Sequence, residues 1–178
     1  MKNIASIFLA STLVLTSCKT MNNSETQTQE MPIIDAALSS NPLMKKSSLQ
    51  YQAPEFDKIK DEHFKPALDY GLKVQQVEIQ KIAHQNTTPT FENTVLALEN
   101  SGEVLNRTKL IFSNLTGSNT NSTLQSLDEE FAPKFAAQED MIYLNDQLYQ
   151  RFKAVDTSKL DAESKRLTEF YLQKFEIA

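Results

Sequence analysis

Residues 61–84 read DEHFKPALDYGLKVQQVEIQKIAH, and this stretch decides the fold class. Its apolar residues recur at three- and four-residue intervals, which predicts an α-helix. Pro66 is tolerated only in the first turns, so we expect the helix to begin near Asp61 to Lys65, with Asp61 as its cap, and to end near His84. The apolar face is wide enough to pack against two neighbours. It comprises a stripe of Phe64, Leu68, Leu72, Ile79 and Ile82, flanked by Ala67, Tyr70, Val74 and Val77.

Four further helices are expected downstream, each opened by a polar residue that can cap it. The chain contains only three glycines and no tryptophan, which leaves too few turn residues for many short strands. We therefore predict an all-α protein with antiparallel helices. The expected segments are Thr90 to a stop at Gly117, Asn121 or Ser122 to beyond a kink at Pro133, Asp146 to Ala154, and a last helix capped by Asp161.

The last predicted helix lacks a terminating signal, because neither glycine, a basic last turn nor proline closes it. Its Phe170, Tyr171 and Phe175 need cover from other elements. We therefore interpret residues 41–178 as a helical domain truncated at its C-terminal end. Within it, residues 41–59 carry Pro42 and Pro54 and are expected to form an extended arm across the surface.

The first residues have the layout of an export signal. Lys2 supplies a positive charge, Ile4–Leu15 is largely apolar but too short to cross a bilayer, and Cys18 follows small residues. The sequence Leu15-Thr16-Ser17-Cys18 resembles the bacterial lipobox. We expect residues 1–17 to be a lipoprotein signal peptide, Cys18 to carry the lipid, and residues 18–40 to be a flexible tether. The protein would then lie in the bacterial cell envelope, with the membrane as a partner through its lipid anchor.

An ordinary secretory leader is the alternative interpretation of this segment. It leaves the single cysteine unexplained, since an exported chain with one cysteine has no internal disulfide partner. The net charge of −5 makes nucleic acid an unfavourable partner.

The residues show no recognisable catalytic or metal-ligating motif. His63 and His84 are the only histidines and do not have the spacing of zinc ligands. We interpret His63 as a capping or surface residue and His84 as solvated. The acidic groups 128–130 and 139–140 are interpreted as a solvated helical face. No catalytic or metal-binding residue is therefore assigned.

Several short motifs in order resemble the bacterial peptidyl-dipeptidases, also called dipeptidyl carboxypeptidases, which are related to oligopeptidase A and thimet oligopeptidase. The resemblance covers about residues 41–178. The motifs are Asn41-Pro42-Leu43, PEFDKI at 54–59, HFKPAL at 63–68, PTFENT at 89–94, ALExSG at 97–102, Asn119-Thr120-Asn121, IYLN at 142–145 and LDxESxRL at 160–167.

The resemblance implies one helical lobe of a larger, two-lobed zinc metallopeptidase that acts on short peptides. In that family an HExxH helix and a later glutamate hold the zinc, and neither occurs in this sequence. The expected role is a wall of the substrate channel, with zinc and catalysis supplied by the missing C-terminal part of the same protein. The alternative is a free-standing, non-catalytic helical lipoprotein that binds peptides or a protein partner.

Overall fold

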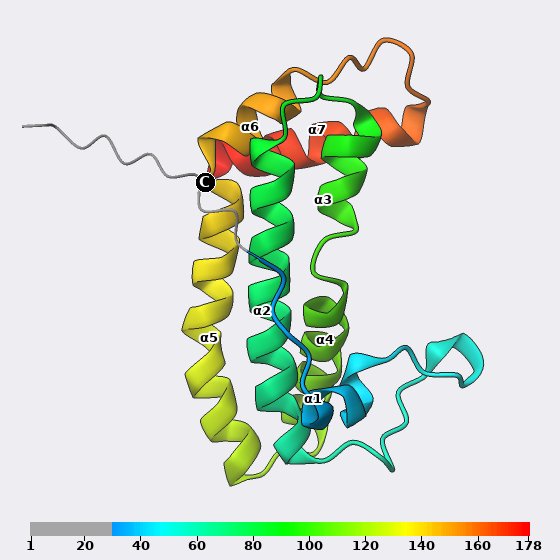
Figure 1. Cartoon of the computed structure of the whole chain (residues 1–178), viewed down its shortest axis with the longest axis vertical. Coiled ribbons are helices and arrows are strands. Elements are labelled where there is room, and N and C mark those ends of the chain that lie inside the picture. Colours follow the sequence, from blue (N-terminus) through cyan, green and yellow to red (C-terminus); the bar gives the residue numbers. More distant parts are fainter. Residues whose placement is uncertain (1–29) are drawn as a thin grey trace, which may run out of the picture.

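The computed structural model describes residues 30–178, and this part of the chain is all-α, without a strand. Two short 3₁₀ turns and one π-helix, labelled η, accompany the α-helices (Figure 1). The predicted signal peptide, Cys18 and most of the predicted tether lie outside the described residues. In chain order the elements are α1 (Ala36–Ser40), η1 (Pro42–Met44), η2 (Gln50–Gln52), α2 (Asp61–His84), η3 (Phe91–Leu96), α3 (Ala97–Glu99), α4 (Glu103–Ser118), α5 (Ser122–Tyr143), α6 (Asp146–Lys153) and α7 (Ala162–Ile177).

Helix α2 is the central element, with α4 on one side and α5 on the other (Figure 1). The chain runs along α2, returns along α3 and α4, and runs back along α5, which confirms the antiparallel arrangement. Helices α6 and α7 lie across the end of this layer. The predicted bounds of α2 are confirmed, but Lys60 rather than Asp61 is the capping residue. The Lys60 backbone N–H donates to His63 Nδ1 at 3.0 Å, which satisfies a donor at the helix start.

The second predicted helix is broken in the structure. It begins as expected at Thr90, whose hydroxyl accepts from the Asn93 backbone N–H at 3.2 Å, but it forms η3 and α3 and then stops. Gly102 has a φ of 67°, a left-handed conformation, and its N–H donates to Glu78 Oε2 of α2 at 2.7 Å. Helix α4 starts immediately afterwards. Gly117 lies inside α4 and is not its stop, so that prediction was wrong.

The positions of the remaining predicted helices are confirmed, while the kink at Pro133 stays a prediction. Side-chain oxygens of Asn121, Asn145 and Asp161 accept backbone N–H groups at the starts of α5, α6 and α7. Helix α5 continues through Pro133 as one element. Among residues 30–178, no helix combines the length and the hydropathy that a membrane crossing requires.

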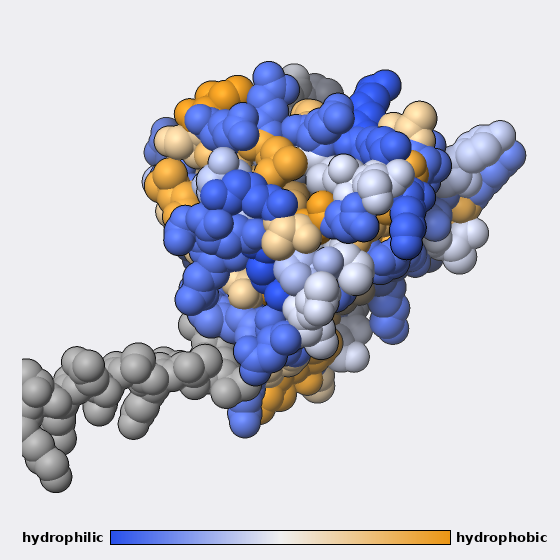
Figure 2. Space-filling model, turned by 90° about the horizontal axis from the view of Figure 1, so that it is seen from above, coloured by the Kyte–Doolittle hydropathy of each residue, from blue (hydrophilic) through white to orange (hydrophobic). Residues whose placement is uncertain are grey.

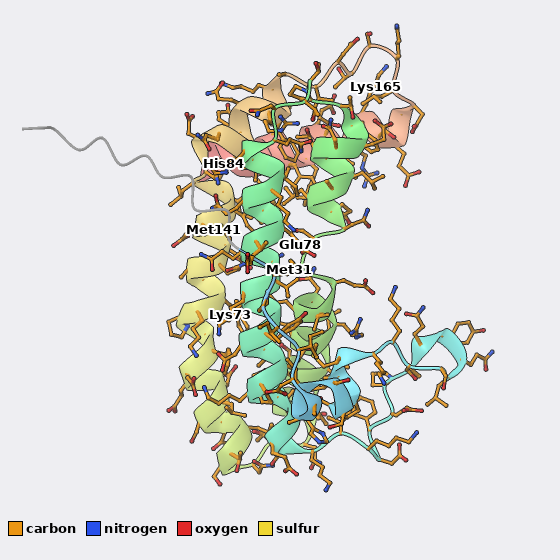
Figure 3. The ribbon with its side chains drawn as sticks, viewed as in Figure 1. Met31, Lys73, Glu78, His84, Met141 and Lys165 are labelled. Atoms are coloured by element: carbon orange, nitrogen blue, oxygen red, sulfur yellow. The ribbon has the colours of Figure 1, made fainter. Side chains whose placement is uncertain are left out.

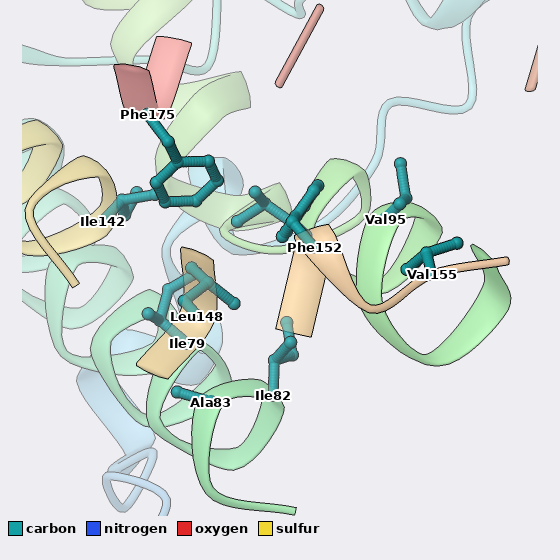
Figure 4. Packing of buried hydrophobic residues seen from close by; sticks show 10 residues of the cluster. Ile79, Ile82, Ala83, Val95, Ile142, Leu148, Phe152, Val155 and Phe175 are labelled. Atoms are coloured by element: carbon teal, nitrogen blue, oxygen red, sulfur yellow. The ribbon is translucent and has the colours of Figure 1, made fainter. Parts of the chain in front are cut away.

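Two apolar cores lie along α2. The lower core packs the first half of α2 against η1, α4 and the start of α5, and Phe64 and Phe112 have ring centroids 5.2 Å apart there. The upper core packs the second half of α2 against η3, α3, the end of α5, α6 and α7 (Figure 4). Gly71 permits the close approach of α2 and α4, since a Cβ there would lie 2.9 Å from the Leu105 backbone. The wide apolar face of α2 is therefore explained by packing on several sides.

Residues 41–59, the arm, are attached more firmly than the predicted extended segment on the surface would be. Leu43 is 1% exposed in the lower core, and Asn41 Nδ2 donates to the His63 carbonyl at 2.7 Å. Residues 36–40, expected to be flexible tether, form the short helix α1, with Asp35 capping it.

The aromatic residues of α7 are better covered than expected. Phe175 is buried against Tyr143, Tyr149 and Phe152. Tyr171 is half-buried, and Phe170 remains 48% exposed. The expectation that all three rings lack cover was therefore wrong for Phe175. Seen from above, the end formed by α6 and α7 is mainly hydrophilic, with scattered hydrophobic side chains (Figure 2).

A charged network joins α2 to α5. Glu130 lies on an exposed helical face, as expected, and also pairs with lysines of both helices. Lys134 Nζ lies 2.7 Å from Glu130 Oε1 and 3.4 Å from Asp69 Oδ1, and Lys65 also pairs with both carboxylates. Lys134 lies over the ring of Phe131, 4.1 Å from its centroid. The hydrogen bonds from Lys134 and Lys65 lower the pKa of the Glu130 carboxyl.

This network predicts acid sensitivity. Because the folded-state pKa of Glu130 is lowered, its stabilisation is complete above the unfolded pKa of about 4.3 and disappears as pH falls through the folded value. We expect the Tm of the wild type to fall between about pH 5 and pH 3. The Tm of Glu130→Gln should fall less steeply over this range. Calorimetry across this pH range measures the slope of Tm against pH for each protein. The neighbouring exposed Glu129→Gln should retain the wild-type slope, and identical slopes for all three proteins would contradict the prediction.

Candidate functional site

A groove lies between the arm and the α3–α4 segment. Its volume is about 840 Å³. The arm contributes Lys45, Lys46 and Gln52, and α4 contributes Arg107 and Leu110. The groove is therefore both charged and apolar, a mixture that suits a peptide or protein segment.

Ion pairs hold the two walls of this groove together. Lys46 Nζ of the arm lies 2.7 Å from Glu103 Oε1 of α4. Arg107 Nη2 donates to the Leu43 carbonyl at 3.1 Å, and its Nη1 lies 3.4 Å from Glu103 Oε1. The hydrogen bond from Lys46 lowers the pKa of Glu103, which keeps this carboxyl ionised at neutral pH. Neither histidine nor cysteine lines the groove in the described chain, so its groups fit binding better than proton transfer.

A smaller polar pocket of about 220 Å³ opens at the break between α3 and α4, facing α5 and α7. The Tyr171 hydroxyl donates to Glu99 there. Burial and this carboxylate raise the pKa of Tyr171, so the hydroxyl remains a donor at neutral pH. From the sequence Tyr171 is interpreted as an apolar ring, and its pairing with Glu99 is not predicted because the two residues lie in separate helices.

Arg151 is a buried cation that the sequence analysis also missed. Its guanidinium Nη1 donates to the Gln85 and Thr87 carbonyls at 2.8 and 3.0 Å. Its Nη2 donates to Asn93 Oδ1 and Thr94 Oγ1 at 3.2 and 3.3 Å. Burial lowers the pKa of Arg151. This side chain holds the loop between α2 and η3 in place, which is a structural role.

The two histidines cannot share a metal. His63 lies at the start of α2. His84 lies at its end (Figure 3), so the two are roughly 30 Å apart at the helical rise per residue. His84 Nδ1 lies 2.9 Å from the Gln80 carbonyl of its own helix. Within residues 30–178, no three His, Cys, Asp or Glu side chains are arranged to hold a metal ion. These residues therefore do not fit a zinc site. Cys18, the predicted lipid attachment point, lies outside the described residues.

Comparison with known proteins adds the family context. No family model matches the chain. The chain is 45% identical over 145 residues to a dipeptidyl carboxypeptidase of Salmonella typhimurium, a match that covers 79% of this chain and 21% of that protein. It is 43% identical over 142 residues to a dipeptidyl carboxypeptidase of Escherichia coli, covering 78% of this chain and 21% of that protein. These matches support the dipeptidyl carboxypeptidase family.

These matches agree with the family named in the sequence resemblance. The chain spans about a fifth of the length of the curated relatives it matches. The closer relationship to oligopeptidase A and thimet oligopeptidase stays a prediction, as does the signal peptide.

Proposed function

We propose that this chain is the N-terminal part of a longer zinc metallopeptidase that removes dipeptides from the C-termini of short peptides. The observation that carries the proposal is the 45% identity, over 145 residues, to a dipeptidyl carboxypeptidase of which the match covers only 21%. In this proposal the zinc and its ligands belong to the remaining part of the polypeptide. The separated positions of His63 and His84 agree with that division.

The role we propose for this part is to form one wall of the substrate channel. Helices α2, α4 and α5 pack through buried apolar side chains into a layer that backbone hydrogen bonds stiffen. Such a wall excludes folded proteins by size and leaves room for a short extended peptide.

The test compares the chain alone with a longer polypeptide that continues past residue 178. We call this longer polypeptide the extended product. We expect the 20.2 kDa chain to hold no stoichiometric zinc and to release no dipeptides, because two distant histidines cannot supply the three ligands of a catalytic zinc. The extended product should hold stoichiometric zinc and release dipeptides. Metal analysis and a dipeptide-release assay give the readouts.

The control for this test is His63→Ala in the extended product, which should retain its zinc. One zinc held by the chain alone, and lost on replacing His63 or His84, would contradict the proposal. A native product no larger than this chain would favour the non-catalytic binding lipoprotein instead.

We further propose that the protein is anchored in the bacterial cell envelope by a lipid on Cys18. A serine hydroxyl cannot form the lipid thioether, so Cys18→Ser is expected to move the protein from the membrane fraction to the soluble fraction. Fractionation followed by immunoblotting measures this distribution. Met21→Ala, close by in the predicted tether, should remain in the membrane fraction. Membrane association of a processed Cys18→Ser protein would rule out lipidation as its anchor.

A further inference from the structure

We propose that the surface formed by the arm and α4 docks onto the remaining part of the same longer polypeptide. We define this arm–α4 face by four exposed apolar residues: Leu49, Tyr51, Phe56 and Leu110. The inference rests on the proposed function, because it requires the chain to belong to a longer protein. The new element is the side of the helical layer that contacts the rest of that protein.

The first observation is the exposure of these large apolar side chains. Tyr51 is 93% exposed and Leu110 is 73% exposed, while Leu49 and Phe56 are 49% and 46% exposed. Single exposed apolar residues are normal on a protein surface, but a group on one side marks an interaction surface. Leu110 of α4 lines the 840 Å³ groove together with Gln52, Pro54 and Glu55 of the arm, which are sequence neighbours of Tyr51 and Phe56.

The second observation is the backbone at the outer part of the arm. Tyr51 and Gln52 have φ angles of 58° and 55°, although neither is a glycine. Side chains disfavour this left-handed conformation, and two such residues in succession are unusual. Residues in such conformations occur often at ligand-binding and contact sites. The conformation presents the Tyr51 ring to solvent, away from both cores.

The third observation is that the arm is braced at both ends. Leu43 is buried in the lower core, and Arg107 Nη2 of α4 donates to its carbonyl. At the other end, the chain enters α2 through Lys60, whose N–H bonds to His63. A loop held in this way loses little conformational entropy on binding, which favours a permanent contact.

The occupant we infer is the rest of the polypeptide, because the matched relatives are about five times longer than the matched segment. A membrane surface fits less well, since two of the basic side chains here, Lys46 and Lys58, are paired with acidic ones. Lys46 Nζ lies 2.7 Å from Glu103, and Lys58 Nζ lies 3.0 Å from Glu55. Anionic lipids attract clusters of unpaired basic residues instead.

Hydroxyl-radical footprinting tests the inference by comparing the chain alone with the extended product. We expect oxidation of Tyr51 to fall about tenfold in the extended product, and that of Phe56 and Leu110 to fall severalfold, because contact at an interface core excludes water. Leu110→Arg in the extended product should restore the oxidation of Tyr51. The matched control is Leu144→Arg, at the far end of α5, which is 63% exposed and should leave Tyr51 protected.

Native polypeptide size, measured on an immunoblot, separates failure of this inference from failure of the proposed function. A larger native polypeptide in which Tyr51 reacts as fast as in the chain alone would overturn the inference and leave the proposed function standing. A native polypeptide of this chain's own size would overturn both. Protection of Tyr51 in the chain alone that rises with its concentration, or that needs lipid vesicles, would assign the surface to a second copy or to a membrane and also overturn the inference.

Discussion

Replacing Phe152 with alanine is expected to lower the free energy of unfolding by about 3–5 kcal/mol. Phe152 is 1% exposed in the upper core, and its ring centroid lies 5.1 Å from that of Phe175 and 5.7 Å from that of Tyr171. Its removal leaves a cavity where α6 and α7 meet. Since small domains have a total stability of about 5–15 kcal/mol, this loss is a large fraction.

Urea denaturation, followed by circular dichroism, measures the effect of Phe152→Ala. The matched control is Phe170→Ala, which removes the same ring from a site that is 48% exposed and should cost under about 1 kcal/mol. Equal losses for the two variants would show that the upper core does not depend on the packing of Phe152.

Replacing Arg151 with alanine is expected to cost about 3 kcal/mol of stability, because buried hydrogen-bonding groups then lose their partners. The guanidinium of Arg151 is the donor to the Gln85 and Thr87 carbonyls and to Asn93 and Thr94. Its loss takes this donor from the Gln85 and Thr87 carbonyls of the loop and removes one hydrogen bond each from Asn93 and Thr94 of η3. The loop between α2 and η3 should then exchange its amide hydrogens faster than in the wild type.

Two further variants identify the cause of the Arg151 effect. Arg151→Lys retains the charge but lacks the planar fork, so it should recover less than half of the lost stability. Arg166→Ala, at an exposed position of α7, should change stability by less than about 0.5 kcal/mol. Full recovery in Arg151→Lys would show that charge alone, rather than the geometry of the guanidinium, holds the loop.

The groove shows why a site can escape sequence analysis. Lys46 and Glu103 form an ion pair across it but lie far apart in the chain, and each is an ordinary surface residue by type. The same holds for Tyr171 and Glu99, which are 72 residues apart. Such a pair can be predicted from the sequence only when its residues belong to a motif with fixed spacing. Neither of these pairs belongs to such a motif. The resemblance to the dipeptidyl carboxypeptidases, by contrast, could be recognised from the sequence, because many short motifs occur in the same order.

By itself the sequence determined the all-α class, the bounds of α2 and the capped starts at Thr90, Asn121 and Asp161. These features depend on contacts three or four residues apart, which the local pattern records. Tertiary structure decided the break between α3 and α4, where the Gly102 N–H meets Glu78, 24 residues earlier. It also decided the burial of Leu43 and the cover over Phe175. Such contacts form only when distant segments pack together, so no local window of sequence contains them.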